Sequence, residues 1–196
     1  MRRILHQGFL AILISCLFLS CQSNSSSPKP RGYFRIDFPT KKFLHYQTSC
    51  PFTFDYPDYA KPIADTSKGS EPCWINLEFP QFNGTLHISY KEISSEKMLH
   101  QLTEDARDFA YKHTVKATDI EEFPISIPEQ NVYGVFYNIE GNTASSSQFY
   151  LTDNTHHYLR AALYFNEVPR ADSIAPVIKF VNYDLQKMIK TFRWTH

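Results

Sequence analysis

Four cysteines are the residues of this chain with the most distinctive chemistry, and two of them lie near its start. Cys21 follows a short basic segment and an apolar run of about twelve residues, and a serine-rich polar stretch comes directly after it. A helix that crosses a bilayer needs about twenty apolar residues, so this run is too short to span one. The pattern instead predicts a lipoprotein signal over residues 1–20, with Cys21 as the acylated residue.

Cys16 is the alternative acylation site, because the residues before it form a more usual signal box. Cleavage before Cys16 would shorten the apolar core to about seven residues, the lower limit for such a segment. Cys21 has the unusual Phe18 three residues before it, but the polar stretch follows it at once. We prefer Cys21, where a diacylglycerol and an amide-linked chain such as palmitate would together give stable anchoring.

Cys50 and Cys73 belong to the exported part of the chain, where an oxidising compartment favours a disulfide between them. Closing a loop of about 24 residues would stabilise the fold by about 3 kcal/mol in the chain-entropy model. A zinc site would need further Cys or His ligands close by, and a catalytic dithiol normally has the spacing Cys-x-x-Cys. We therefore interpret this pair as structural.

The densest group of polar side chains lies between positions 145 and 157, and its members are Ser145, Ser146, Ser147, Asp153, His156 and His157. These residue types could form a Ser–His–Asp arrangement or bind a metal ion. However, adjacent residues of a strand point to opposite faces, and no oxyanion donor is evident. We interpret the segment as a polar strand and a hairpin tip, and keep a periplasmic ligand-binding or hydrolytic site there as the alternative. The rest of the sequence carries no phosphate-binding loop, Gly-x-Ser-x-Gly or His-Glu-x-x-His motif, so we expect no catalytic residues, metal or cofactor.

The polar residues 21–32 read as a tether stiffened by prolines, and residues 33–196 read as one domain. Arg2 and Arg3 leave with the signal, so 18 of the 20 basic residues remain beside 20 acidic ones. This near balance argues against nucleic-acid binding.

Period-two alternation predicts strands over residues 33–38, 52–56, 74–79 and 85–90, each closely followed by a turn or a proline. A meander of three further strands is predicted over residues 132–139, 145–152 and 157–165. Apolar residues spaced by three and four predict one helix after Ser94 or Ser95 and another after Asp172. Residues 61–72 and 120–131 remain as long loops and are candidate contact regions.

This order of elements predicts an α+β fold in which two amphipathic helices cover an antiparallel sheet. It resembles the Mog1/PsbP-like sandwich, a likeness of element order that carries no function by itself.

Blocks of sequence spread over the mature chain resemble the gliding motility lipoprotein GldD family. The blocks are residues 31–39, 50–57, 73–77, 111–114, 141–149, 163–166 and 172–177. The resemblance implies a lipoprotein of the Bacteroidetes cell envelope that is needed for gliding and is linked to type IX secretion. It implies partners among the other gliding and secretion proteins of the envelope, and it supplies no catalytic residues.

Two further expectations concern location and modification. No acidic run follows Cys21, so we expect a periplasm-facing position, and either the inner or the outer membrane could hold the lipid. Asp172-Ser173-Ile174 matches the three-residue O-glycosylation motif of exported Bacteroidetes proteins, which makes Ser173 a candidate site. Helix capping explains the same residues equally well.

Overall fold

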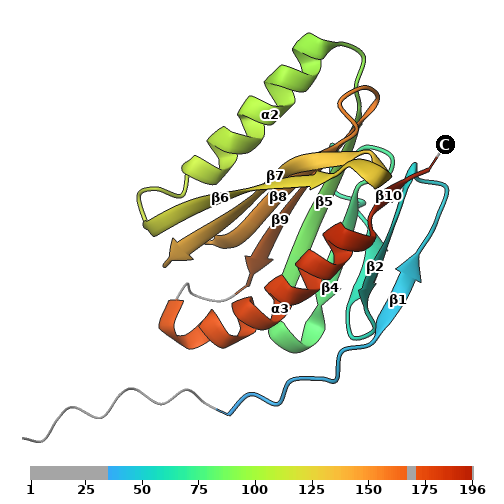
Figure 1. Cartoon of the computed structure of the whole chain (residues 1–196). Coiled ribbons are helices and arrows are strands. Elements are labelled where there is room, and N and C mark those ends of the chain that lie inside the picture. The colour runs from blue at the N-terminus through green and yellow to red at the C-terminus, as the bar shows by residue number, and fades with distance from the viewer. Residues whose placement is uncertain (1–34, 167–170, 196) are drawn as a thin grey trace, which may run out of the picture. The chain divides into compact units, whose positions relative to one another are not determined.

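The computed structural model describes residues 35–166 and 171–195 (Figure 1). Its elements are β1 (Phe43–Tyr46), β2 (Phe52–Pro57), β3 (Lys61–Ala64), β4 (Ile75–Phe79), η1 (Pro80–Phe82), β5 (Gly84–Glu92), α2 (Glu96–Tyr111), β6 (Ala117–Ile127), η2 (Pro128–Gln130), β7 (Val132–Gly141), β8 (Ser145–Thr152), β9 (His157–Phe165), α3 (Ala171–Thr191) and β10 (Arg193–Trp194). Within this part of the chain, no helix has the length and apolar character needed to span a membrane.

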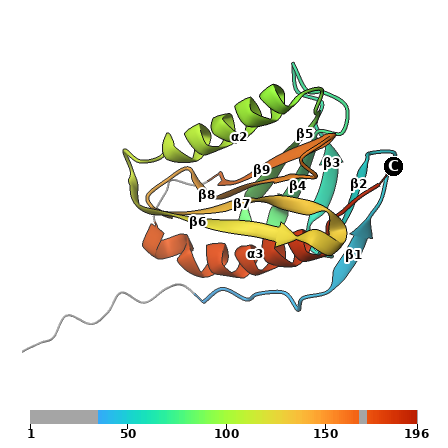
Figure 2. The ribbon, with the colours of Figure 1, turned by 45° about the horizontal axis from the view of Figure 1, so that its top comes forward.

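Seven strands form one antiparallel sheet in the order β3-β4-β5-β9-β8-β7-β6. A smaller sheet has the order β1-β2-β10. Figure 2 shows α2 on one face of the large sheet and α3 on the other. The expected α+β fold, an antiparallel sheet covered by two helices, is confirmed.

The main core lies between α3, the small sheet and the inner face of the large sheet. Its fully buried members include Phe54 of β2, Leu86 of β5, Phe149 of β8 and Leu185 of α3. These residues come from the alternating strands and from the stripe of α3 that the sequence predicts to be buried. A second, smaller cluster around Tyr137 packs beneath the carboxyl-terminal half of α2.

Helix α2 begins where the sequence predicts, because the Ser95 side chain accepts a hydrogen bond from the backbone N–H of Met98. The helix is less well covered than its apolar stripe suggests: Leu99 and Leu102 in its first half are only half-buried, and Phe109 near its end is 42% exposed. The amphipathic pattern correctly predicted the helix but overestimated how much of it the sheet covers.

The strand expected over residues 33–38 is absent from the described part of that range, and the first strand is β1 instead. Residues 36–42 run as an extended segment beside α3, and we call them the strap. Phe38 stacks on Phe180 of α3 with ring centroids 4.4 Å apart, and the Lys41 ammonium lies 2.7 Å from an Asp184 carboxylate oxygen. The alternating side chains of this segment therefore pack on a helix, and the segment is not hydrogen-bonded into a sheet as expected.

Two segments expected as loops contain strands, and these strands form the two edges of the large sheet. β3 lies within residues 61–72, and β6 replaces most of the loop expected over residues 120–131. Edge strands have a neighbour on one side only, so their side chains stay wetter and alternate less clearly. Pro62 lies in β3 and Pro124 in β6, and proline is tolerated at sheet edges.

Candidate functional site

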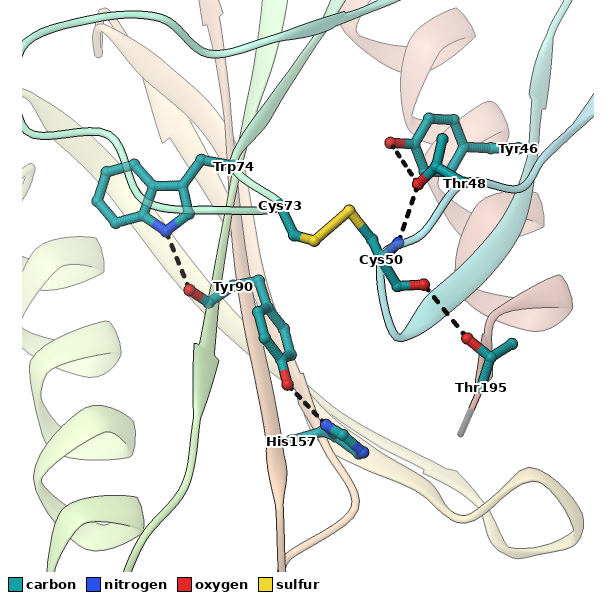
Figure 3. Close-up of a disulfide and its surroundings, with 8 residues drawn as sticks. All are labelled: Tyr46, Thr48, Cys50, Cys73, Trp74, Tyr90, His157 and Thr195. Carbon is teal, nitrogen blue, oxygen red and sulfur yellow. Dashed lines mark hydrogen bonds between the residues drawn. A yellow bond between two sulfur atoms is a disulfide. The ribbon is translucent and has the colours of Figure 1, made fainter.

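Cys21, the predicted acylation site, lies outside the described residues. Cys50 and Cys73 are joined by a disulfide, with their Cα atoms 5.5 Å apart (Figure 3). The bond ties the turn before β2 to the start of β4, so it links the small sheet to the large one. The Thr195 hydroxyl donates to the Cys50 carbonyl oxygen over 3.3 Å, which adds the end of the chain to this corner.

His157 belongs to the same corner and is used in packing. Its Nδ1 lies 2.8 Å from the Tyr90 hydroxyl, and its ring stacks on Trp194 at 5.1 Å between centroids. Burial, followed by the negative charges of Glu92 and Asp153, raises the pKa of Tyr90, so its hydroxyl stays protonated. This histidine therefore fastens β10 to β9.

The six polar residues between Ser145 and His157 do not converge on a site. Ser145 begins β8 and Asp153 directly follows its last residue, so a rise of about 3.4 Å per residue places them about 27 Å apart. Ser145 and Ser147 are fully buried, and the Ser147 hydroxyl donates to Asn182 of α3 over 2.7 Å. The structure therefore contradicts the alternative of a Ser–His–Asp arrangement in this segment.

Asp153 has a structural use at the hairpin tip. One carboxylate oxygen accepts the backbone N–H groups of Thr155, His156 and His157 at 2.8 to 2.9 Å. Burial alone would raise the pKa of Asp153, but these backbone donors lower it below its ordinary value. The carboxylate is thus kept ionised, and it stabilises the turn through these hydrogen bonds. Among the described residues, no three His, Cys, Asp or Glu side chains gather as a metal site.

Ser173 is exposed in the first turn of α3. A modifying enzyme could reach it there, and its glycosylation stays a prediction.

The most distinctive surface is the outer edge of the large sheet. β6 is 11 residues long and ends the sheet on one side, so its outward backbone groups have no strand partner among the described residues. Phe123 in its middle is 49% exposed, and Asp119 and Glu121 are exposed beside it. The opposite edge, β3, has only four residues, and Lys61 and Pro62 protect it from pairing.

An open depression of about 420 Å³ adjoins this edge beneath the first half of α2. It is lined by Glu96, Leu99, His100, Thr103, Ile125, Tyr133, Gly134, Tyr150, Thr152 and Asn154. Glu122 of β6 accepts a hydrogen bond from the Tyr111 hydroxyl over 2.8 Å and lies 3.4 Å from Arg107 Nε, which fixes α2 to the edge strand. We call β6 and this depression the β6 surface. It has the form of a docking surface for an extended polypeptide.

Sequence reasoning placed a contact region over residues 120–131 but missed its strand character. The spacing of Ile125 and Ile127 was the available signal, since both pack on the main core from one face of β6. Pro124 between Phe123 and Ile125 obscured it.

The model of a known family, gliding motility lipoprotein GldD, matches residues 23–194 of the chain. The chain belongs to this family. Its members are gliding motility lipoproteins, so the protein is a lipid-anchored component of the cell envelope with a part in gliding.

Comparison with solved structures finds similarity to the solution structure of cyanobacterial PsbP (CyanoP) from Synechocystis sp. PCC 6803. The TM-score is 0.47 at 17% sequence identity, over 80% of this chain and 94% of that one. No curated protein has a sequence that matches this chain.

Proposed function

We propose that this gliding lipoprotein works by docking and not by catalysis, as a periplasm-facing component of the machinery linked to type IX secretion. Family membership supports the role in gliding. Two observations carry the docking role. β6 is a long edge strand without a strand partner on its outer side among the described residues, and the polar residues between Ser145 and His157 do not form a site. Acylated Cys21 would hold the protein at the membrane, and residues 21–32 would give it reach.

The occupant of the β6 surface that we propose is an extended, basic segment of another envelope protein. It would add a strand to β6 through main-chain hydrogen bonds, which supply affinity in this mode of recognition. Its lysines or arginines would face Asp119 and Glu121, and an apolar side chain would cover Phe123. Burying one large aromatic side chain at the centre of such a contact gives it an anchor.

Replacing Cys21 with alanine is expected to release the protein from the membrane fraction and to abolish gliding, because the lipid attachment is lost. The measurement is sedimentation of envelopes together with colony spreading. A Cys16→Ala strain is the matched control and should keep both properties. A Cys21→Ala strain that glides normally, with its protein still in the membrane fraction, would refute the anchoring step.

The double charge reversal Asp119→Lys, Glu121→Lys is expected to reduce spreading at least tenfold while protein level and membrane sedimentation stay unchanged. Both side chains are exposed, so folding should tolerate the change. The reversal places like charges against a basic partner strand, which costs several kcal/mol in such contacts.

The control is Glu104→Lys, Asp108→Lys, which makes the same charge change on exposed positions of α2. This control should spread normally. Normal spreading of the β6 variant would exclude the β6 surface as the docking site, even if the anchoring result holds.

A further inference from the structure

Arg160 of β9 lies on the α2 face of the large sheet, away from the β6 edge, and it is held in one position. One of its terminal nitrogens donates to the Gln148 side-chain oxygen over 2.6 Å, and its guanidinium carbon lies 4.6 Å from the Phe109 ring centroid. The residue is half-buried. Fixing a guanidinium by stacking and a hydrogen bond orients its remaining N–H donors, because the group is planar.

This guanidinium lacks a carboxylate partner among the described residues. Other cations of the domain have one: Arg107 pairs with Glu122, Lys41 with Asp184 and Lys91 with Glu71. Burial lowers the pKa of Arg160, which reflects the cost of holding the charge there. A half-buried charge without its counter-ion is an arrangement that a bound anion would stabilise.

The groups around Arg160 are short of hydrogen-bond acceptors. Gln148 is 1% exposed; its side-chain oxygen accepts from Arg160, and its amide nitrogen has no hydrogen-bond partner among the described residues. The Gln148 amide is thus a buried donor beside the Arg160 cation, and together they are the complement of an oxyanion.

Two further features of the surroundings of Arg160 determine which charge a bound anion should carry. Burial, and then the charge of Arg160, lowers the pKa of His113, so this nearby imidazole is neutral at pH 7. The site also lies at the carboxyl-terminal end of α2, where the helix dipole presents about half a negative charge. A singly charged anion suits this environment better than a dianion.

We propose that Arg160 binds a carboxylate through its free N–H groups, with Gln148 as the positioning residue and Phe109 as an apolar wall. The site is separate from the β6 surface and does not depend on it. A carboxylate matches the planar fork of donors in a guanidinium. Its source is a small organic acid or an acidic residue of a partner polypeptide.

The test is an NMR titration of the full mature chain in buffer free of carboxylates, following the Arg160 Nε–H resonance. Sodium acetate is expected to shift it saturably, with half-saturation at about 10 mM. Acetate should also raise the pKa of His113, since it offsets the Arg160 charge. An acetylated Glu-amide peptide that binds at least tenfold more tightly assigns the ligand to a polypeptide, and equal binding assigns it to a small acid.

In these variants the His113 pKa is the readout: Arg160→Gln should abolish the change that acetate produces, and Arg160→Lys should require at least fivefold more acetate because the fork is lost. Arg193→Gln removes an exposed arginine of β10, outside the proposed site, and should leave the response intact. A wild-type protein that shows no saturable shift and no change in the His113 pKa would overturn the proposal, without the need for any variant to fold. A response to inorganic phosphate alone would overturn the assignment to carboxylates.

Discussion

Replacing Lys41 with methionine is expected to lower the free energy of unfolding by about 2–3 kcal/mol. Asp184 on α3 is 1% exposed, and its carboxylate has two partners, the Lys41 ammonium at 2.7 Å and the Tyr59 hydroxyl. Without Lys41, the buried Asp184 carboxylate keeps only the neutral Tyr59 hydroxyl as a hydrogen-bond donor. The Lys41 side chain is 23% exposed, so the loss is smaller than the 3–5 kcal/mol typical of a fully buried pair.

The measurement is urea unfolding, in which this loss corresponds to a midpoint about 1 M lower. Lys42→Met is the matched control, because Lys42 is the exposed neighbour in the strap and should change stability by less than about 0.5 kcal/mol. The double variant Lys41→Met, Asp184→Asn removes the unpaired charge and should recover most of the loss. A double variant no more stable than Lys41→Met would show that the ion pair is not what holds the strap.

This ion pair also shows where sequence reasoning ends. Lys41 and Asp184 are 143 residues apart, and nothing in the local pattern around either one indicates the other. The apolar and polar residues that alternate around Phe38 predicted a strand. Such alternation indicates that one side of an extended segment is buried, but it does not indicate which kind of element covers that side. A helix covers that side here, through Phe180 and Asp184.

Patterns with a local physical cause were predicted well. The stripe of α3 is set by side chains three and four positions apart, and Ser95 caps α2 through a bond within one turn. β4 and much of β5 alternate between buried and wetter positions, whereas β8 and β9 are buried almost throughout because a helix covers each face of the sheet. The Cys50–Cys73 pair could be inferred from export and from the absence of other ligands, and the structure contains that disulfide.

Sites that depend on strands meeting across the sheet were missed. Arg160 and Gln148 come together because β8 and β9 pair antiparallel, with Tyr150 opposite Arg160 and Gln148 one pleat further along the same face. No spacing motif encodes that contact. Ser145 and His157 failed as a site for the converse reason, since closeness in sequence along an extended strand means separation in space.

Replacing Gly134 with alanine is expected to cost at least about 3 kcal/mol or to prevent folding, because the added carbon has no room. Gly134 lies on β7 opposite Leu151 of β8. A Cβ atom there would lie 1.9 Å from the Tyr150 carbonyl oxygen and 2.9 Å from its carbonyl carbon. Both are backbone atoms of the neighbouring strand, so relief requires the β7–β8 ladder to separate near the floor of the depression.

Gly84→Ala on β5 is the matched control, because both positions are strand glycines. Its added carbon would meet Phe165 ring atoms at 2.9 Å, and this half-buried side chain can rotate away. The control should therefore lose about 1 kcal/mol or less in the same urea experiment. If the two alanine variants unfold at the same midpoint, the close approach of β7 and β8 at Gly134 is not a fixed feature of the fold.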